Sequence, residues 1–169
     1  MKNIVLTGFM GTGKTAVGKE LSRLLNVKLV DIDAEIEKNE RMTINDIFEN
    51  FGEKRFREIE TEMIKKLSKQ NNIIISTGGG AVLREENMSA LRENGIVFCL
   101  SACPETVLKR TSGSDERPLL KVEDPIDRIG ELLKLRMPFY DKAGIMVDTE
   151  GKTPLQIAEE IIETLKCGR

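Results

Sequence analysis

Short apolar runs alternate along the chain with longer segments in which apolar residues recur at helical spacing. The runs at residues 4–6, 27–30, 73–75, 96–100 and 145–147 predict strands. These strands are nearly continuously apolar, which is typical of parallel strands buried on both faces. Alternation of such strands with helices predicts an α/β fold in which helices cover both faces of a parallel sheet. In such folds, ligands bind beyond the carboxyl ends of the strands.

The segments between the strands carry helical periodicity and helix-start signals. Thr43 followed by Asp46 is typical of a helix N-terminus, and a proline after Asp124 predicts another. Helices are also predicted at residues 84–93, from residue 104 to about residue 110, and at residues 154–166. Two apolar helix faces are expected: one with Val17, Leu21, Leu24 and Leu25, the other with Phe56, Ile59, Met63 and Leu67.

Residues 111–124 break every period and are polar and rich in turn-forming residues. An irregular segment of this length in a small domain is usually a functional lid or disordered. Neither a linker nor an internal repeat interrupts the rest of the sequence. We therefore expect one domain over residues 1–169, with a mobile lid at about residues 111–124.

Composition excludes several classes of function. The net charge is -2 and the pI is about 5.5, so a global basic field for nucleic acid is missing. The longest apolar stretches span five residues, too few for a membrane span, and the start does not read as a signal peptide. Three sparse cysteines indicate reduced thiols rather than a disulfide framework. We expect a cytoplasmic protein without nucleic-acid or membrane partners.

The chain contains no histidine. Triads that depend on histidine are therefore excluded. A general base must be Asp, Glu, Lys, Tyr or Cys, or a water molecule oriented by the site.

Residues 8–15, Gly-Phe-Met-Gly-Thr-Gly-Lys-Thr, match the P-loop pattern G-x-x-x-x-G-K-[ST] in full. The motif follows a predicted strand and opens a predicted helix, which is the context it requires. Its backbone N–H groups and the helix N-terminus favour phosphate oxygens. Lys14 is expected to reach the β- and γ-phosphates, and Thr15 to ligate Mg²⁺. The sequence therefore predicts binding of a nucleoside triphosphate.

Two carboxylates, Asp31 and Asp33, stand where the second predicted strand ends. One could hold a metal-bound water, and the other could accept a proton from an attacking hydroxyl. The alternative interpretation is an N-cap for the following helix.

A glycine triplet and two arginines indicate a pocket for an organic acid. Gly78, Gly79 and Gly80 end the third predicted strand and remove side chains where a ligand could lie against the backbone. Arg57 and Arg136 lie on or beside apolar helix faces, and together they suggest a fork for a planar carboxylate. Each arginine alone could equally be a solvated or snorkelling side chain.

Three further cations are candidates for nucleotide contact. Arg117 lies in the predicted lid, where a cation can stabilise the charge of a transferring phosphoryl group. Arg110 and Lys152 flank the expected adenine region. Each of the three could instead be a surface charge.

The assembled pattern resembles the shikimate kinase family over nearly the whole chain. The resemblance rests on residues 8–15, Asp-Ile-Asp at 31–33, Phe-Arg-Glu-Ile-Glu at 56–60, Thr-Gly-Gly-Gly at 77–80, Arg-Pro-Leu-Leu at 117–120, and Arg136 before Pro-Phe-Tyr at 138–140. The resemblance implies transfer of the γ-phosphoryl group of ATP to the 3-hydroxyl of shikimate, giving shikimate 3-phosphate and ADP in aromatic amino-acid biosynthesis. It also implies the nucleoside-monophosphate-kinase type of P-loop fold, with five parallel strands in the order 2-3-1-4-5 and a substrate-binding segment at about residues 32–60.

The resemblance assigns roles residue by residue. One Mg²⁺ ion would be held by Thr15 and, through water, by Asp31. Asp33 would hold shikimate hydroxyls and is the candidate base, with Lys14 and Arg117 as the other catalytic residues. Glu60 would orient Arg57. The ATP-binding residues would be Gly11, Thr12, Gly13, Lys14, Thr15, Ala16, Arg110, Arg117 and Lys152, although position 152 is commonly Arg in similar proteins. The shikimate-binding residues would be Asp33, Arg57, Gly78, Gly79, Gly80 and Arg136.

Other functions compete with this interpretation. Another small-metabolite or nucleotide kinase, such as a gluconate or nucleoside-monophosphate kinase, is the nearest alternative. A GTPase-like switch is disfavoured because the D-x-x-G match at residues 141–144 precedes a strand and no Asn-Lys-x-Asp exists to read guanine. A nucleotide-binding module without turnover is disfavoured by the Asp pair and Arg117. The expected oligomeric state is a monomer, because no coiled-coil pattern or long apolar strip is present.

Overall fold

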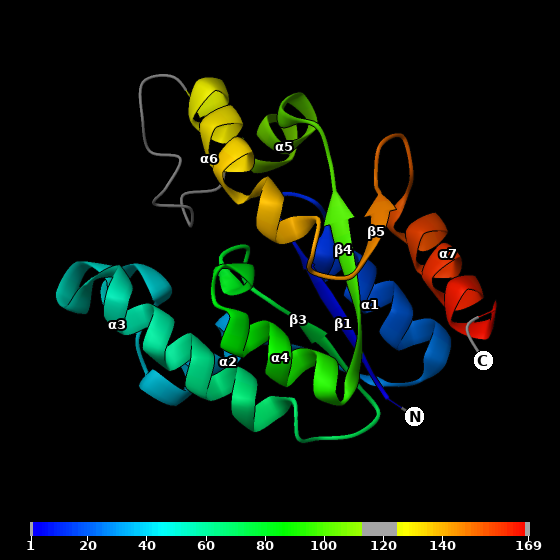
Figure 1. The fold of residues 1–169 in the computed structure, drawn as a ribbon, viewed down its shortest axis with the longest axis horizontal. Helices are drawn as coiled ribbons and strands as arrows, with labels where there is room; N and C mark the ends of the chain where they lie inside the picture. The colour runs from blue at the N-terminus through cyan, green and yellow to red at the C-terminus, as the bar shows by residue number, and fades with distance from the viewer. Residues whose placement is uncertain (1, 113–124, 168–169) are drawn as a thin grey trace.

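The computed structural model describes residues 2–112 and 125–167. Five parallel strands form one sheet in the order β2-β3-β1-β4-β5 (Figure 1), as predicted. The strands are β1 (Asn3–Gly8), β2 (Lys28–Asp31), β3 (Ile73–Ser76), β4 (Gly95–Ser101) and β5 (Ile145–Asp148). Strand β1 therefore lies at the centre of the sheet, so the loop after β1 lies in the middle of the edge formed by the carboxyl ends of the strands.

Helices cover both faces of the sheet, because alternate strand residues supply two separate apolar cores. Ile4 and Leu6 pack on one side of β1 with residues of α1 (Lys14–Leu25) and α7 (Pro154–Cys167). Val5 faces the other core, which is larger and includes residues of α3 (Ile44–Leu67). The remaining helical elements are α2 (Ile32–Glu40), η1 (Ala81–Leu83), α4 (Glu85–Glu93), α5 (Pro104–Thr111) and α6 (Pro125–Tyr140).

Most predicted helix boundaries agree with the structure. Thr43 and Asp46 form a reciprocal capping box at the start of α3, as their spacing predicts. Helix α2 begins directly after β2, as the N-cap interpretation of the Asp pair implies, whereas the 3₁₀ turn η1 was not predicted. The turn η1 has three residues and follows the glycine triplet, where apolar periodicity is weak.

Helix α3 contains a break that shapes the space beside the sheet. Gly52 has φ 79° and ψ 168°, a conformation that residues with a Cβ rarely adopt, so the helix bends there. The rings of Phe48 and Phe56, one on each side of the break, pack with centroids 4.8 Å apart. The bend therefore lets Phe48 pack against Phe56, and residues before the bend line the cavity described below.

The predicted lid falls mostly outside the described residues. Thr111 is the last residue of α5 and is buried, and its hydroxyl donates to the Val107 carbonyl oxygen at 2.7 Å. Arg117 lies in the segment that is not described, so its predicted contact with the phosphates stays a prediction. Within residues 2–112 and 125–167, no helix has both the length and the apolar character to cross a membrane.

Candidate active site

The P-loop occupies the centre of the carboxyl edge, between the end of β1 and the start of α1. Its turn needs left-handed backbone, with φ 74° at Gly11 and 94° at Gly13, which glycine adopts without strain. The Lys14 ammonium lies over the loop and donates to the carbonyl oxygens of Gly8 at 2.9 Å and Phe9 at 2.8 Å. The loop and α1 together form one wall of a cavity of about 700 Å³.

Cavity-lining residues come from the P-loop, the end of β2, α2, α3, the turn after β3, α5 and α6. This volume is in the range of small-molecule sites. The predicted residues in the lining are Gly11, Gly13, Lys14, Thr15, Ala16, Asp31, Asp33, Arg57, Gly78, Gly79, Gly80, Arg110 and Arg136. Sequence reasoning did not find Met10, Ala34, Glu37, Ile44, Asn45 and Phe48, which belong to the same lining. The missed residues are mostly apolar or come from the part of α3 before the bend at Gly52.

Asp31 is the N-cap of α2 and also contacts the start of α1. Its Oδ1 accepts hydrogen bonds from the backbone N–H groups of Asp33 and Ala34, so it is the N-cap of α2. Its Oδ2 accepts a hydrogen bond of 3.2 Å from the Thr15 hydroxyl. The cap therefore aims the second carboxylate oxygen at the start of α1, where phosphate is expected.

Asp33 has an environment that disfavours its charge. Burial is the main reason that the pKa of Asp33 rises from 3.8 to about 7, and the carboxylates of Glu60 and Asp31 add to the rise. Lys14 and Arg57 oppose it. Its buried Oδ1 atom has no hydrogen-bond partner among the described residues. A carboxyl group with a pKa near neutrality is suited to exchange a proton with a ligand hydroxyl.

Arg57 is held on α3 by two carboxylates. Its guanidinium contacts Glu60 at 2.8 Å and Glu53 at 3.2 Å and lies over the Phe56 ring, 5.1 Å from the centroid. Glu60 is fully buried, and burial raises its pKa against the opposing effect of Arg57. The expected orientation of Arg57 by Glu60 is therefore present in the structure.

Arg136 reaches the same cavity from α6. It lies on the buried face of that helix with Ile129 and Leu132, as their spacing predicts, and its side chain lies over the Phe9 ring at 5.9 Å. Arg136 also lowers the pKa of Glu60, so it is close to the Arg57 pair. Two guanidiniums from different helices thus line one cavity beside the P-loop, and neither is a solvated surface group.

Each glycine of the triplet avoids a different neighbour. A Cβ on Gly78 would lie 2.9 Å from a Glu60 carboxylate oxygen and 3.1 Å from Asp33 Oδ1. On Gly79 it would lie 3.2 Å from the Met10 backbone nitrogen in the P-loop. A Cβ on Gly80 would lie 2.3 Å from the Arg57 guanidinium. The turn therefore brings the carboxylates, the phosphate loop and the guanidinium to one point.

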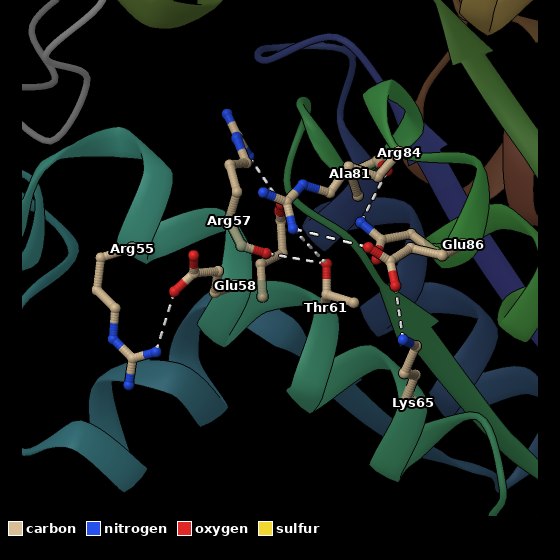
Figure 2. A network of polar contacts seen from close by, with 10 residues as sticks. Arg55, Arg57, Glu58, Thr61, Lys65, Ala81, Arg84 and Glu86 are labelled. Carbon is tan, nitrogen blue, oxygen red and sulfur yellow. Dashed lines mark hydrogen bonds and ion pairs between the residues drawn. The ribbon is translucent and has the colours of Figure 1, made fainter.

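Further polar contacts attach α3 to the segment after the glycine turn (Figure 2). The Thr61 hydroxyl donates to the Arg57 carbonyl oxygen at 2.9 Å and lies 3.5 Å from an Arg84 nitrogen that donates to it. Glu86 pairs with Lys65 at 2.6 Å and with Arg84 at 3.7 Å. Arg84 also lowers the pKa of Glu60. The network fixes the backbone that carries Arg57 and Glu60.

The two cations predicted for the adenine region differ in position. Arg110 lines the cavity, and its guanidinium donates to the Gly11 carbonyl oxygen at 3.4 Å and to the Thr149 hydroxyl at 3.1 Å. Lys152 instead donates to Glu160 on α7 at 2.7 Å and is not among the cavity-lining residues. Thr12, also predicted to bind ATP, is buried under the loop with its hydroxyl on the Phe9 carbonyl oxygen at 2.8 Å.

The fold and this site define a P-loop kinase. The phosphate loop, a carboxyl group with a raised pKa and two inward guanidiniums share one cavity at the carboxyl edge of a parallel sheet. Comparisons with known proteins identify the family. The sequence profile of the family described as "Shikimate kinase" matches residues 10–166.

Relatives match over nearly their whole length. A shikimate kinase of Thermodesulfovibrio yellowstonii is 53% identical over 163 residues, which cover 96% of this chain and 94% of the relative. A shikimate kinase of Caldicellulosiruptor bescii is 51% identical with the same coverage. The solved shikimate kinase from Acinetobacter baumannii, in complex with shikimate, superposes with a TM-score of 0.97 at 36% identity and covers 100% of this chain and 95% of its own.

The chain belongs to the shikimate kinase family. The family consists of ATP-dependent kinases that phosphorylate shikimate. The sequence-based resemblance, the fold type and the strand order are confirmed.

Proposed function

We propose that this chain transfers the γ-phosphoryl group of ATP to the 3-hydroxyl of shikimate and that the cavity described above holds both substrates. One observation carries the assignment: Arg57 and Arg136 line the same cavity as the P-loop. Arginine binds a carboxylate through paired N–H donors, so two converging guanidiniums suit an acceptor that carries one carboxylate. A nucleoside monophosphate or a sugar acid would also present an anion, so the acceptor must be tested directly.

Asp33 is the proposed acceptor of the hydroxyl proton. Its Oδ1 lies beside Gly78, at the junction of the acceptor pocket and the P-loop. With a pKa raised to about 7 by burial, its carboxylate is a stronger base than an ordinary aspartate while remaining largely ionised above neutral pH. Hydrogen bonds to the shikimate hydroxyls would orient the attacking oxygen.

Lys14 and the N-terminus of α1 are proposed to bind the β- and γ-phosphates. Phosphate oxygens are stronger acceptors than the two P-loop carbonyl oxygens that the ammonium contacts, so Lys14 can exchange one set for the other. Gly11, Gly13, Thr15 and Ala16 line the same wall and supply backbone N–H groups. We assign Arg117 a role in stabilising the transferring phosphoryl group, as its sequence position predicts.

A divalent cation, Mg²⁺, fits the residues at the start of α1. Thr15 would hold the ion directly and Asp31 through water; their hydroxyl and carboxylate oxygens lie 3.2 Å apart and are the hard donors that Mg²⁺ prefers. In the described part of the chain no cluster of three or more His, Cys, Asp or Glu could hold a metal ion, so phosphate oxygens and water must complete the shell. When bound, the ion neutralises charge on the β- and γ-phosphates.

We also infer that the protein works as a monomer in the cytoplasm. The sequence contains no coiled-coil pattern or long apolar strip that would favour obligate assembly. The free cysteines Cys99, Cys103 and Cys167 are consistent with a reducing compartment. Light scattering after size-exclusion chromatography tests the monomer, for which the expected mass is 19.0 kDa.

The acceptor is tested by measuring ADP formation with shikimate, gluconate, AMP and CMP in the presence of Mg²⁺. Of these four acceptors, only shikimate is expected to support ADP formation. Arg136→Ala should weaken shikimate binding by roughly 2–5 kcal/mol, because it removes one partner of a desolvated ion pair, while the KM for ATP changes little.

Arg128→Ala is the matched control on the same helix. Arg128 is partly exposed and pairs with Glu131 on the same helix at 3.4 Å, so its loss should leave both KM values unchanged. Turnover of another acceptor with shikimate inert would overturn the proposed substrate. Equal, small effects of the two arginine variants would overturn the carboxylate fork.

A further inference from the structure

Tyr140 contacts two parts of the site that lie far apart in the sequence. It ends α6, is 3% exposed, and its hydroxyl donates to the Gly79 carbonyl oxygen at 2.7 Å. Its ring meets the Phe9 ring edge-to-face, with centroids 6.5 Å apart and an interplanar angle of 88°. Phe9 belongs to the P-loop and Gly79 to the glycine turn. One side chain therefore packs against the phosphate loop and hydrogen-bonds the turn beside it.

The hydrogen bond sets the direction of a peptide group. The Gly79 C=O and the Gly80 N–H belong to one planar unit, and no peptide bond in the described ranges is cis. In a trans peptide these two groups point in opposite directions. When Tyr140 holds the carbonyl oxygen, the Gly80 N–H points away from Tyr140, and Gly80 lines the cavity. Three consecutive glycines have much conformational freedom. Backbone bonds from Ala81 to Gly78 and from Leu83 to Gly80 restrain the turn, and the Tyr140 bond restrains the Gly79 carbonyl oxygen.

Arg136 belongs to the same arrangement. It precedes Tyr140 by four residues on α6, so both side chains lie on one helix face. Its guanidinium lies over the Phe9 ring at 5.9 Å. The Phe9 ring is thus contacted by both α6 residues, one of which lines the cavity while the other contacts the glycine turn. A shift of α6 would move Arg136 and the anchor of the Gly79 carbonyl together.

We propose that Tyr140 is a positioning residue for the acceptor, holding the Gly79–Gly80 peptide group with its N–H toward the cavity and joining that group to the helix that carries Arg136. This inference rests on the proposed assignment of the cavity to shikimate. Tyr140 acts through the glycine turn and takes no proton from the substrate. Its hydroxyl donates to the Gly79 carbonyl oxygen and also interacts with Arg136, while its ring maintains the packing on Phe9.

Tyr140→Phe separates these contributions, because it deletes the hydroxyl and keeps the ring. The KM for shikimate is expected to rise about tenfold, which corresponds to about 1.4 kcal/mol or one net hydrogen bond. The KM for ATP should stay within about twofold, since the P-loop packing is retained. A purely structural role of Tyr140 would not raise the KM for shikimate while leaving the KM for ATP unchanged.

Thr164→Val is the matched control. It also deletes a hydroxyl that donates to a backbone carbonyl oxygen, that of Glu160 at 2.9 Å, but on α7, which packs on the other face of the sheet. Both KM values should match those of the wild type. A shikimate KM in Tyr140→Phe equal to that of the wild type would overturn the positioning role.

The composition provides a second readout. Tyr140 is the only tyrosine of the chain and there is no tryptophan, so tyrosine emission reports this one side chain. When shikimate is titrated into the wild-type enzyme, the tyrosine emission should change until the site is saturated. The reason is that the proposed ligand site includes the peptide group to which the Tyr140 hydroxyl is hydrogen-bonded. An emission that stays constant while shikimate saturates the enzyme would contradict the proposed link.

The design distinguishes this inference from the proposed function. Wild-type ADP formation is measured in the same assay. A wild type without shikimate-dependent ADP formation would overturn the proposed function and this inference together. A shikimate-active wild type with a normal shikimate KM in Tyr140→Phe would overturn this inference alone.

Discussion

At the scale of single residues, the site depends on charges that are costly to bury. Asp33, Glu60 and Arg57 meet at the glycine turn, with Glu60 fully buried and Arg57 9% exposed. A buried ion pair contributes little net stability, because desolvation offsets the Coulombic attraction. We therefore interpret these side chains as serving the acceptor site at some expense of stability.

The pH dependence of catalysis follows from Asp33. If Asp33 accepts the hydroxyl proton, kcat/KM for shikimate should rise with pH and level off above its pKa of about 7. Asp33→Asn should lower kcat by about 10²–10⁴-fold and abolish this rise. Steady-state rates measured from about pH 5.5 to about pH 9 check the prediction, because this range lies on both sides of the Asp33 pKa. The exposed carboxylate of Glu159 on α7 provides a control, since Glu159→Gln should keep the wild-type profile.

The same carboxyl group should reduce stability as pH rises. Its pKa is higher in the folded state, about 7, than the ordinary 3.8, so between these values the folded state binds more protons than the unfolded state. The contribution of Asp33 to stability is therefore largest below pH 3.8 and is lost as pH rises to 7. Asp33→Asn should be more stable than the wild type at pH 8 by roughly 1–4 kcal/mol. Urea unfolding at that pH measures it, and an equal or lower stability would contradict the buried-charge interpretation.

At the scale of elements, turns and breaks at glycine decide where the functional side chains lie. Gly52 bends α3 so that Phe48 packs against Phe56, and the glycine turn after β3 receives the P-loop and Arg57. The glycines at these positions have no side chain that could bind a ligand. Their function is to let other groups approach closely.

Gly80→Ala tests this packing. The new Cβ would lie 2.3–2.5 Å from the Arg57 guanidinium, which must move. A displaced guanidinium should lower kcat/KM for shikimate by about 10²-fold and leave the KM for ATP unchanged. Gly130→Ala on α6 is the matched control, because its Cβ would meet nothing within 4 Å. That variant should retain full activity and gain about 0.5–1 kcal/mol of stability, since alanine favours a helix. Similar activities of both variants would contradict the role of Gly80.

At the scale of the whole molecule, the carboxyl ends of the strands carry the candidate site, whereas contacts at their amino ends stabilise the fold. The carboxyl edge carries the cavity. At the amino edge, the buried side chain of Asn3 donates to the carbonyl oxygens of Ser68 at 3.4 Å and Gln70 at 2.7 Å and accepts from the Ile73 N–H at 3.2 Å. These bonds join β1 to the connection between α3 and β3. Polar contacts at this edge stabilise the fold without taking part in the site.

Asn3→Ala should therefore affect stability and spare substrate binding. It leaves the buried Ile73 N–H without its acceptor, which should reduce the free energy of unfolding by about 2–4 kcal/mol. Asn39→Ala, at an exposed position of α2, should change it by less than about 0.5 kcal/mol. Urea unfolding and both KM values check the pair. A raised shikimate KM in folded Asn3→Ala would contradict the separation of the two edges.

The local pattern of the chain carried much of the fold. Continuous apolar runs predicted the strands and their parallel arrangement, and the fully matched P-loop placed the phosphate site between β1 and α1. Thr43 and Asp46 predicted the start of α3 because capping involves groups three residues apart. Signals of this kind act over one turn of helix or along one strand, so the order of residues expresses them directly.

Other features depend on residues that only the fold brings together. The pocket wall around Phe48, the anchor from Tyr140 to Gly79 across 61 positions, and the Asn3 bonds across 65 to 70 positions left no periodic signal. The position of Lys152 could not be predicted from the sequence either, because its pairing with Glu160 depends on how α7 packs. By itself, the sequence determined the parallel α/β architecture, the phosphate loop and the identity of the charged groups, since these depend on local periodicity and spacing. Tertiary structure alone decided which groups share the cavity, how deeply each charge is buried and hence its pKa, because those properties arise from contacts between distant segments.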